Sequence, residues 1–171
     1  MIPVKGIGLL RAPEQSDLDW LHSLENNPSL WYLGYSKEPF SREVLRNYLE
    51  QQPGSLLRDG QIRLVLEHDG APAGALDLYD YDPFARKAGV GIVLDDQHRG
   101  KGWAKEAMIA FERYVFGTLG LHSLFAMVPG KNEASLALFE GLGYKKIGEL
   151  DDWVLHNGEY ESALLYQKLK V

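Results

Sequence analysis

The order of apolar and polar residues along the chain predicts two kinds of element. Apolar side chains at every second position favour strands, and apolar side chains at every third or fourth position favour helices. The segments that read as strands are residues 4–11, 61–68, 71–79, 87–94, 123–128, 153–156 and 160–168. Helical spacing follows Ser16 and Ser41, which we expect to be N-caps, and recurs over residues 103–116 and 132–142. Residues 27–40 are aromatic-rich without either period, so we expect a structured loop there.

The sequence of these elements indicates the fold class. Strands come first, a strand-helix-strand unit covers residues 87–128, and a helix and a hairpin close the chain. Such a unit places two strands parallel, whereas hairpins place them antiparallel. We therefore expect an α/β fold with a mixed central sheet and helices on both faces. A chain of 171 residues can bury about 70% of its unfolded surface, so residues 1–171 are expected to form a single domain.

Composition narrows the chemistry. The chain has no cysteine, which excludes disulfides, cysteine metal ligands and a covalent cysteine nucleophile. The five histidines lack the paired spacing of a zinc site, so no metal is expected. No apolar stretch approaches the roughly 20 residues that cross a bilayer, and we expect a cytoplasmic protein without membrane contact. The formal net charge of −6 disfavours nucleic-acid binding and favours cations such as polyamines.

Residues 99–104, Arg-Gly-Lys-Gly-Trp-Ala, join a strand-like segment to a helical one. A glycine turn that opens a helix aims unpaired backbone N–H groups and the positive end of the helix dipole at one point, which suits a phosphate. Glycine also lets a phosphate approach the amides and permits positive φ. The spacing matches neither a Walker loop nor a dinucleotide-binding turn. It predicts a site for a different phosphorylated cofactor.

The pattern Arg-x-x-Gly-x-Ala in this turn resembles the acyl-CoA pyrophosphate loop of the GCN5-related N-acetyltransferases. Residues 132–144 resemble the second signature of that family, an Asn-initiated helix that ends in Leu-Gly-Tyr. Residues 25–28, 38–40 and 157–160 are similar to the branch that contains spermidine acetyltransferases and ribosomal-protein N-terminal acetyltransferases. The resemblance covers nearly the whole chain.

The resemblance implies a V-shaped splay between two parallel strands and acetyl-CoA as the co-substrate. An edge opened inside a sheet has free N–H and C=O groups, with which the pantetheine arm can pair. The residues that the resemblance assigns to the cofactor are Ile92, Val93, Leu94, Arg99, Gly100, Lys101, Gly102, Trp103, Ala104, Lys105, Asn132 and Ser135. Asn132 is also expected to cap its helix.

Two positions depart from the family pattern. Phe139 stands where many members carry a tyrosine that protonates the departing thiolate, and Gly89 stands where polyamine-type members often carry a glutamate. Phenylalanine cannot donate a proton, so we expect slowed or rerouted transfer. Ser135 lies one helical turn before Phe139 on the same face, and its hydroxyl is the candidate to hold a water or to donate to sulfur.

The acceptor side of the site is less well defined by the sequence. Glu38 matches a glutamate of the polyamine-type pattern and is a candidate substrate contact, or else it only faces solvent. Trp31, Tyr32 and Tyr35 either wall an acceptor pocket or pack in the core. The alternative bases, which the sequence does not separate, are Glu67, Asp77, Asp80 and Asp82.

These features predict an acetyl-CoA-dependent N-acetyltransferase that acts on a small primary amine, with a polyamine slightly favoured. One alternative is an enzyme that acetylates a protein N-terminus. Another is a catalytically weakened acyl-CoA-binding module, which Phe139 and Gly89 suggest. The closing hairpin and the habit of the family favour a homo-oligomer, a dimer or larger.

Overall fold

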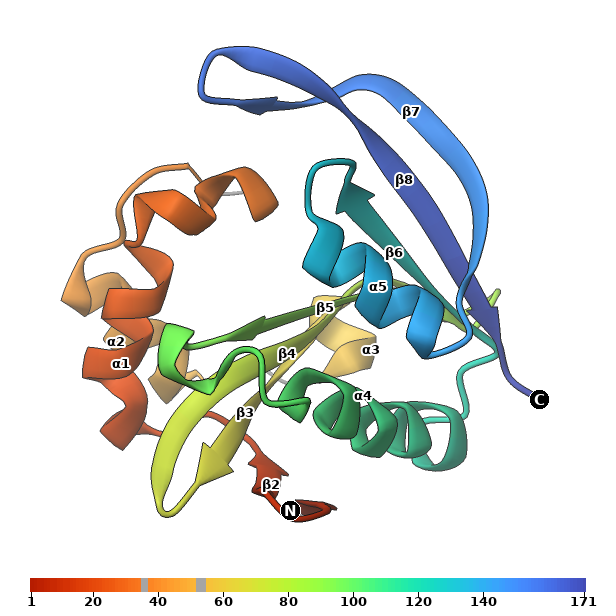
Figure 1. The fold of residues 1–171 in the computed structure, drawn as a ribbon. Coiled ribbons are helices and arrows are strands. Elements are labelled where there is room, and N and C mark those ends of the chain that lie inside the picture. Colours follow the sequence, from red (N-terminus) through yellow and green to blue (C-terminus); the bar gives the residue numbers. More distant parts are fainter. Residues whose placement is uncertain (35–36, 52–54) are drawn as a thin grey trace.

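The strands of the protein form one twisted sheet (Figure 1). The computed structural model describes residues 1–34, 37–51 and 55–171. In these residues the strand order is β1-β2-β3-β4-β5-β6-β8-β7, and every neighbouring pair is antiparallel except the parallel pair β5 and β6. The strands are β1 (Ile2–Val4), β2 (Gly8–Arg11), β3 (Ile62–His68), β4 (Ala71–Asp82), β5 (Lys87–Leu94), β6 (Ser123–Pro129), β7 (Lys145–His156) and β8 (Glu159–Leu169). The expected mixed sheet is confirmed.

Helices cover both faces of the sheet. They are α1 (Leu18–Glu25), α2 (Arg42–Glu50), α3 (Leu56–Asp59), α4 (Trp103–Arg113) and α5 (Glu133–Gly141). On one face, Phe111 of α4 and Phe139 of α5 join the main core with Leu76 of β4 (Figure 1). On the other face, α1 and α2 form a smaller apolar cluster, and Glu25 of α1 pairs with Arg63 of β3. No helix in the described residues is long and apolar enough to span a bilayer.

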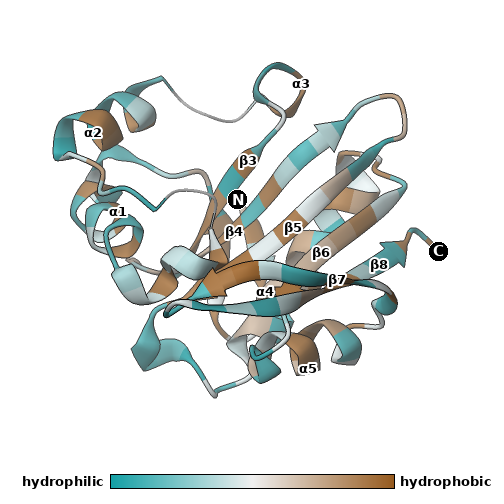
Figure 2. Ribbon diagram, turned by 90° about the horizontal axis from the view of Figure 1, so that it is seen from above, coloured by the Kyte–Doolittle hydropathy of each residue, from teal (hydrophilic) through white to brown (hydrophobic). Residues whose placement is uncertain are grey.

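Short helical turns complete the connections between these elements. They are the 3-10 helices η1 (Gln15–Asp17), η2 (Pro28–Leu33) and η3 (Asp96–His98), and the π-helical turn η4 (Tyr114–Thr118) that continues α4. The segment expected to be a structured loop therefore contains η2. The hydropathy of the sheet is visible in Figure 2, where apolar residues mark much of β5 and β6.

The parallel strands β5 and β6 separate after three residue pairs. Lys87, Ala88 and Gly89 pair with β6, whereas residues 90–94 continue beside β4 alone. β6 continues to Pro129 beside β8 on its other side. The two strands therefore open into a V, which confirms the expected splay and leaves one backbone edge of β5 without a neighbouring strand.

The N-terminal prediction was wrong in two details. The segment 4–11 is a hairpin of β1 and β2, because Gly6 with φ of 71° reverses the chain. Ser16 lies within η1, whose capping box joins Glu14 and Asp17, and the N-cap position of α1 is Asp17, without a side-chain cap hydrogen bond. The Asp17 carboxylate instead accepts hydrogen bonds from Arg11. The second cap is confirmed, since Ser41 accepts a hydrogen bond from the Val44 amide at 3.2 Å.

The last hairpin is longer than predicted. β7 begins at Lys145, eight residues before the predicted start at Trp153. Much of β7 is exposed and pairs only with β8, so its sequence carries no steady alternation. Its extended conformation comes from the partner strand, which a single-strand pattern does not reveal.

Candidate active site

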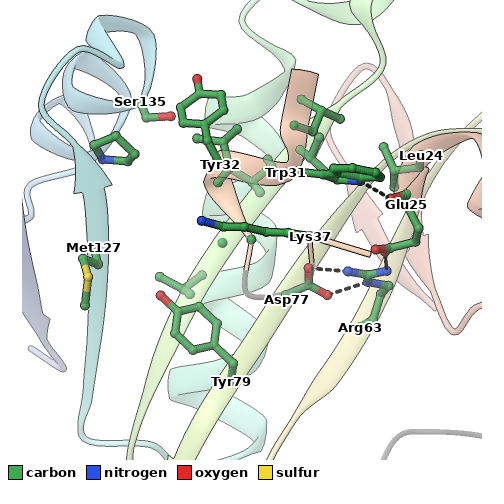
Figure 3. A pocket seen from close by; sticks show the side chains of 18 of the residues that line it. Leu24, Glu25, Trp31, Tyr32, Lys37, Arg63, Asp77, Tyr79, Met127 and Ser135 are labelled. Atoms are coloured by element: carbon green, nitrogen blue, oxygen red, sulfur yellow. Dashed lines mark hydrogen bonds and ion pairs between the residues drawn. The ribbon is translucent and has the colours of Figure 1, made fainter. Parts of the chain in front are cut away.

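A cavity of about 700 Å³ lies where β5 and β6 diverge. α1, η2 and α2 bound it on one side, and β6, the start of α5 and β7 bound it on the other (Figure 3). Most of its lining is apolar or aromatic, as in Leu21, Leu24, Trp31, Phe40, Tyr48, Tyr79, Ile92, Val93, Met127 and Trp153. Such a cavity is large enough for a small organic ligand.

The open edge of β5 forms one wall of this cavity. Ile92 and Val93, two of the residues predicted to contact the cofactor, line it. Leu94 does not line the cavity; its side chain is buried in the core, and its carbonyl accepts a hydrogen bond from Arg99 Nε at 2.9 Å. The backbone of residues 92–93 is thus exposed to a ligand, while the end of the strand is tied to the following loop.

The glycine turn after β5 has the backbone shape that the sequence predicted. Gly100 and Gly102 have φ of 72° and 78°, and Gly102 is the N-cap of α4. An added Cβ at either glycine would meet no atom within 4 Å, so here the glycines serve the backbone conformation and leave space beside it. The first turn of α4, which includes Ala104, then presents amides without intrahelical acceptors. These features fit a diphosphate.

The charged and aromatic side chains of this turn hold its shape. Arg99 bonds Leu94 and also pairs with Asp96 at 2.9 Å, so part of its hydrogen-bonding capacity serves the turn itself. The Trp103 ring stacks on His98 at 4.8 Å between centroids, and Lys101 lies over it at 5.5 Å. The side chains of Arg99, Lys101 and Trp103 therefore hold the loop that leads into α4. Lys105 follows in the first turn of this helix.

The start of α5 brings the two predicted catalytic positions to the cavity. Asn132 caps the helix, with Oδ1 accepting a hydrogen bond from the Ser135 amide at 3.2 Å. Asn132, Ser135 and Phe139 all line the cavity, and the Ser135 hydroxyl points toward it (Figure 3). Phe139 is buried edge-on against Tyr144, with ring centroids 5.0 Å apart. The shared face of Ser135 and Phe139 is as the helical spacing predicted.

The aromatic segment forms the roof of the cavity. Trp31 lines it and donates a hydrogen bond from Nε1 to the Glu25 carbonyl at 2.8 Å. Tyr32 stacks on His156 of β7 with centroids 4.0 Å apart, which joins η2 to the last hairpin above the cavity. Glu38 is exposed and is not among the lining residues, and Tyr35 lies outside the described residues.

The structure separates the alternative bases that the sequence left open. Asp77 lines the cavity, whereas Glu67, Asp80 and Asp82 are not part of the lining. Arg63 donates from Nε and Nη2 to Asp77 at 2.7 and 3.0 Å and also pairs with Glu25. Burial alone would lower the pKa of Arg63, but the charges of Asp77 and Glu25 outweigh it and hold the pKa above its ordinary value.

The role of Glu25 and Arg63 was missed in the sequence. A single arginine in a strand carries no signal that it will meet two carboxylates from α1 and β4, since only the packing of α1 on the sheet joins them. In the described residues, no group of three His, Asp or Glu side chains converges on one point as metal ligands would.

The structure explains the glycine found in place of a family glutamate. A Cβ at Gly89 would lie 2.2 Å from the ring of Tyr79, its partner on β4. Tyr79 therefore occupies the space above this part of β5, and its hydroxyl points toward the cavity (Figure 3). The departure at residue 89 is linked to the presence of an aromatic ring on the neighbouring strand.

Comparison with known proteins agrees with this geometry. Residues 9–145 match the family described as acetyltransferase (GNAT) domain. Spermidine N(1)-acetyltransferase of Escherichia coli (strain K12) is 30% identical over 155 residues, which cover 91% of this chain and 82% of that protein. YdaF of Bacillus subtilis (strain 168), named provisionally as a ribosomal N-acetyltransferase, is 30% identical over 165 residues, 94% of this chain and 90% of that protein.

Solved structures show the same arrangement of elements. Spermidine N-acetyltransferase from Vibrio cholerae, in complex with CoA and spermine, is similar with a TM-score of 0.81 at 27% identity. The match covers 94% of each chain. Another structure of that enzyme is dodecameric.

Proposed function

The chain belongs to the GNAT acetyltransferase family and is an N-acetyltransferase, and we propose that it transfers the acetyl group of acetyl-CoA to a small primary amine. The observation that carries the proposal is the free edge of residues 90–94, which leads directly into the glycine turn that opens α4. Pantetheine amides can pair with the edge, and the diphosphate can bind the amides at the helix start. The cavity beside this edge would receive the amine.

Transfer in this chain is direct. The amine nitrogen attacks the thioester carbonyl, the C–S bond breaks, and the amine proton passes to a base or to water while coenzyme A leaves as thiolate. A primary amine with a pKa of about 10.4 is less than a thousandth neutral at pH 7, so this deprotonation matters. Both carboxylate oxygens of Asp77 accept hydrogen bonds from Arg63, so we expect water to carry the proton out of the cavity.

The missing tyrosine slows thiolate release without preventing it. A thiol with a pKa near 8.5 leaves as thiolate at pH 7 at a cost of about 2 kcal/mol. Ser135 is the hydroxyl of α5 that lines the cavity beside Phe139, and it takes the supporting role of holding a water near the sulfur. Proximity of the two substrates supplies the larger part of the rate.

Two acceptor classes follow from the named relatives. The spermidine enzymes support a polyamine, and YdaF supports a protein N-terminus. The dodecameric relative supports a homo-oligomer, which size-exclusion chromatography with light scattering would measure. A cytoplasmic location stays a prediction.

An acceptor panel tests the proposed reaction. Purified protein and acetyl-CoA are incubated with polyamines, short monoamines and peptides with free N-termini, and products are identified by mass spectrometry. We expect an acetylated small amine at a rate well above the uncatalysed reaction. Saturable acetyl-CoA binding without product from any amine or peptide would support the weakened binding module instead, and product from peptides alone would support the N-terminal acetyltransferase.

A further inference from the structure

The charge of the cavity differs from the charge of the whole chain. The chain has a formal net charge of −6, yet the charged side chains that line the cavity in the described residues are two carboxylates, Glu25 and Asp77, and two cations, Arg63 and Lys37. The residues outside the description, 35–36 and 52–54, include no Asp or Glu. The described lining is therefore balanced in charge and offers no excess of carboxylates to a polycation.

Both carboxylates are already engaged. Arg63 holds Asp77 through two hydrogen bonds and pairs with Glu25 through Nη1, so its guanidinium bridges β4 and α1. All three side chains are largely shielded from water, with side-chain exposures between 22% and 28%. A substrate ammonium could use either carboxylate only by competing with a guanidinium that fits both.

Lys37 differs from the other charged residues of the described lining in having no ion-pair partner. Its side chain extends across the cavity from the segment after η2 (Figure 3). It forms no ion pair with any residue that the structure describes, unlike the other three charged lining residues. An ammonium in this position attracts an anionic group on a ligand and repels a second ammonium.

We infer, on the basis of the proposed acetyl transfer, that the acceptor is a primary amine that also carries a carboxylate, and that Lys37 contacts this carboxylate. The remainder of the acceptor is apolar, since aromatic and aliphatic side chains form most of the wall beside Lys37. This class of amine differs from the polyamines named for the relatives. The difference follows from Arg63, which pairs with both carboxylates of the lining, and from Lys37, which has no such partner among the described residues.

Acceptors matched in length test the inference. 5-Aminopentanoate, pentylamine and 1,5-diaminopentane share one amine and one chain length, and differ in a terminal carboxylate, methyl group or ammonium. We expect kcat/KM to be highest for the aminopentanoate, by about fivefold over pentylamine, and lowest for the diamine, as for a partly exposed ion pair. The preference should weaken with added salt.

Variants assign the preference to Lys37. In Lys37→Gln the advantage of the carboxylate should disappear, and in Lys37→Glu the diamine should become the better acceptor. Lys5→Gln, at an exposed turn that does not line the cavity, is the control and should leave the order of the three acceptors unchanged. Circular dichroism and coenzyme A affinity establish that each variant is folded and binds its cofactor.

The outcomes are separable. Equal rates for the three acceptors, a preference for the diamine, or a carboxylate preference that survives in Lys37→Gln would each overturn the inference while leaving acetyl transfer intact. No product from any amine, with coenzyme A still bound, would overturn the proposed function itself.

Discussion

The two halves of β5 differ in the strands beside them. Lys87, Ala88 and Gly89 pair with β4 and with β6, so both backbone edges are used within the sheet. Residues 90–94 pair with β4 only, and the free edge borders the cavity. The second backbone edge of this strand is therefore paired within the sheet at its start and open to the cavity at its end.

Glycines show the difference most directly. A Cβ added at Gly89 or at Gly91 would lie on the same face of β5, the face that the Tyr79 ring covers. A Cβ at Gly89 would lie 2.2 Å from the Tyr79 ring, whereas one at Gly91 would lie 4.0 Å from it. In the half of β5 that pairs with both neighbouring strands, the closed half, the Tyr79 ring leaves no room for a Cβ. In the half that pairs with β4 alone, the open half, a Cβ would fit, so the space beside the cavity is not filled by side chains.

The largest expected effect is on stability in the closed half. Gly89→Ala forces the Tyr79 ring to move, so we expect a loss of about 3 kcal/mol in the free energy of unfolding, as for overpacked cores. Gly91→Ala is the matched control and should change it by less than about 1 kcal/mol. Urea denaturation measures both. Similar losses for the two variants would contradict the proposed difference between the halves.

The next effect concerns the turn that follows the open half. Gly102→Ala places a side chain on a residue with φ of 78°, at a cost of about 1–2 kcal/mol in backbone conformation. We expect the turn to relax and coenzyme A affinity to fall about tenfold by calorimetry. Gly117→Ala, at a glycine with open space and no positive φ, is the control and should bind as the parent does. Unchanged affinity in Gly102→Ala would remove the turn from the cofactor site.

An effect of similar size is expected on the rate of acetyl transfer, at the cavity wall that α5 forms. Phe139→Tyr restores the phenol that many family members use as an acid, so single-turnover acetyl transfer should become about tenfold faster. Ser135→Ala should slow it by a few fold, because a hydroxyl near the sulfur is lost. Rapid-quench measurements with saturating acetyl-CoA give both rates. If neither variant changes the rate with any accepted amine, this face of α5 plays no part in thiolate release.

The smallest expected effect is on stability, and it comes from a hydrogen bond between β8, the neighbour of β6, and α5. Tyr166 of β8 donates a hydrogen bond to Glu140 of α5 at 2.7 Å, and burial with this carboxylate raises the pKa of Tyr166 to about 12. The native state thus keeps the proton that the unfolded chain loses near pH 10. The associated stability is present below pH 10 and is lost as the pH rises toward 12.

The variant Tyr166→Phe tests this contribution. It should lower the free energy of unfolding by about 1 kcal/mol at pH 8, and its stability should fall less steeply than that of the parent above pH 10. Denaturant unfolding at pH 8, 10 and 11 makes the comparison. Parallel pH curves for the two proteins would show that Tyr166 does not titrate as described.

Local patterns were sufficient for the elements that depend on their own residues. The strand 87–94 has the predicted bounds, Ser41 and Asn132 cap their helices, and the glycines of residues 99–104 adopt positive φ. Elements that depend on a partner were not predictable. β7 is extended because β8 lies beside it, and the Asp17 side chain before α1 pairs with Arg11 of β2.

The sequence by itself determined the glycine turn before α4, the face that joins Ser135 to Phe139, and the family, because each is a short-range pattern of residue types. Only the tertiary structure decided the charge of the cavity. Arg63, Glu25 and Asp77 come from β3, α1 and β4, and they form ion pairs only after these elements pack together. Coulomb interactions depend on distance in space, so the net charge of a chain does not predict the charge that a substrate meets.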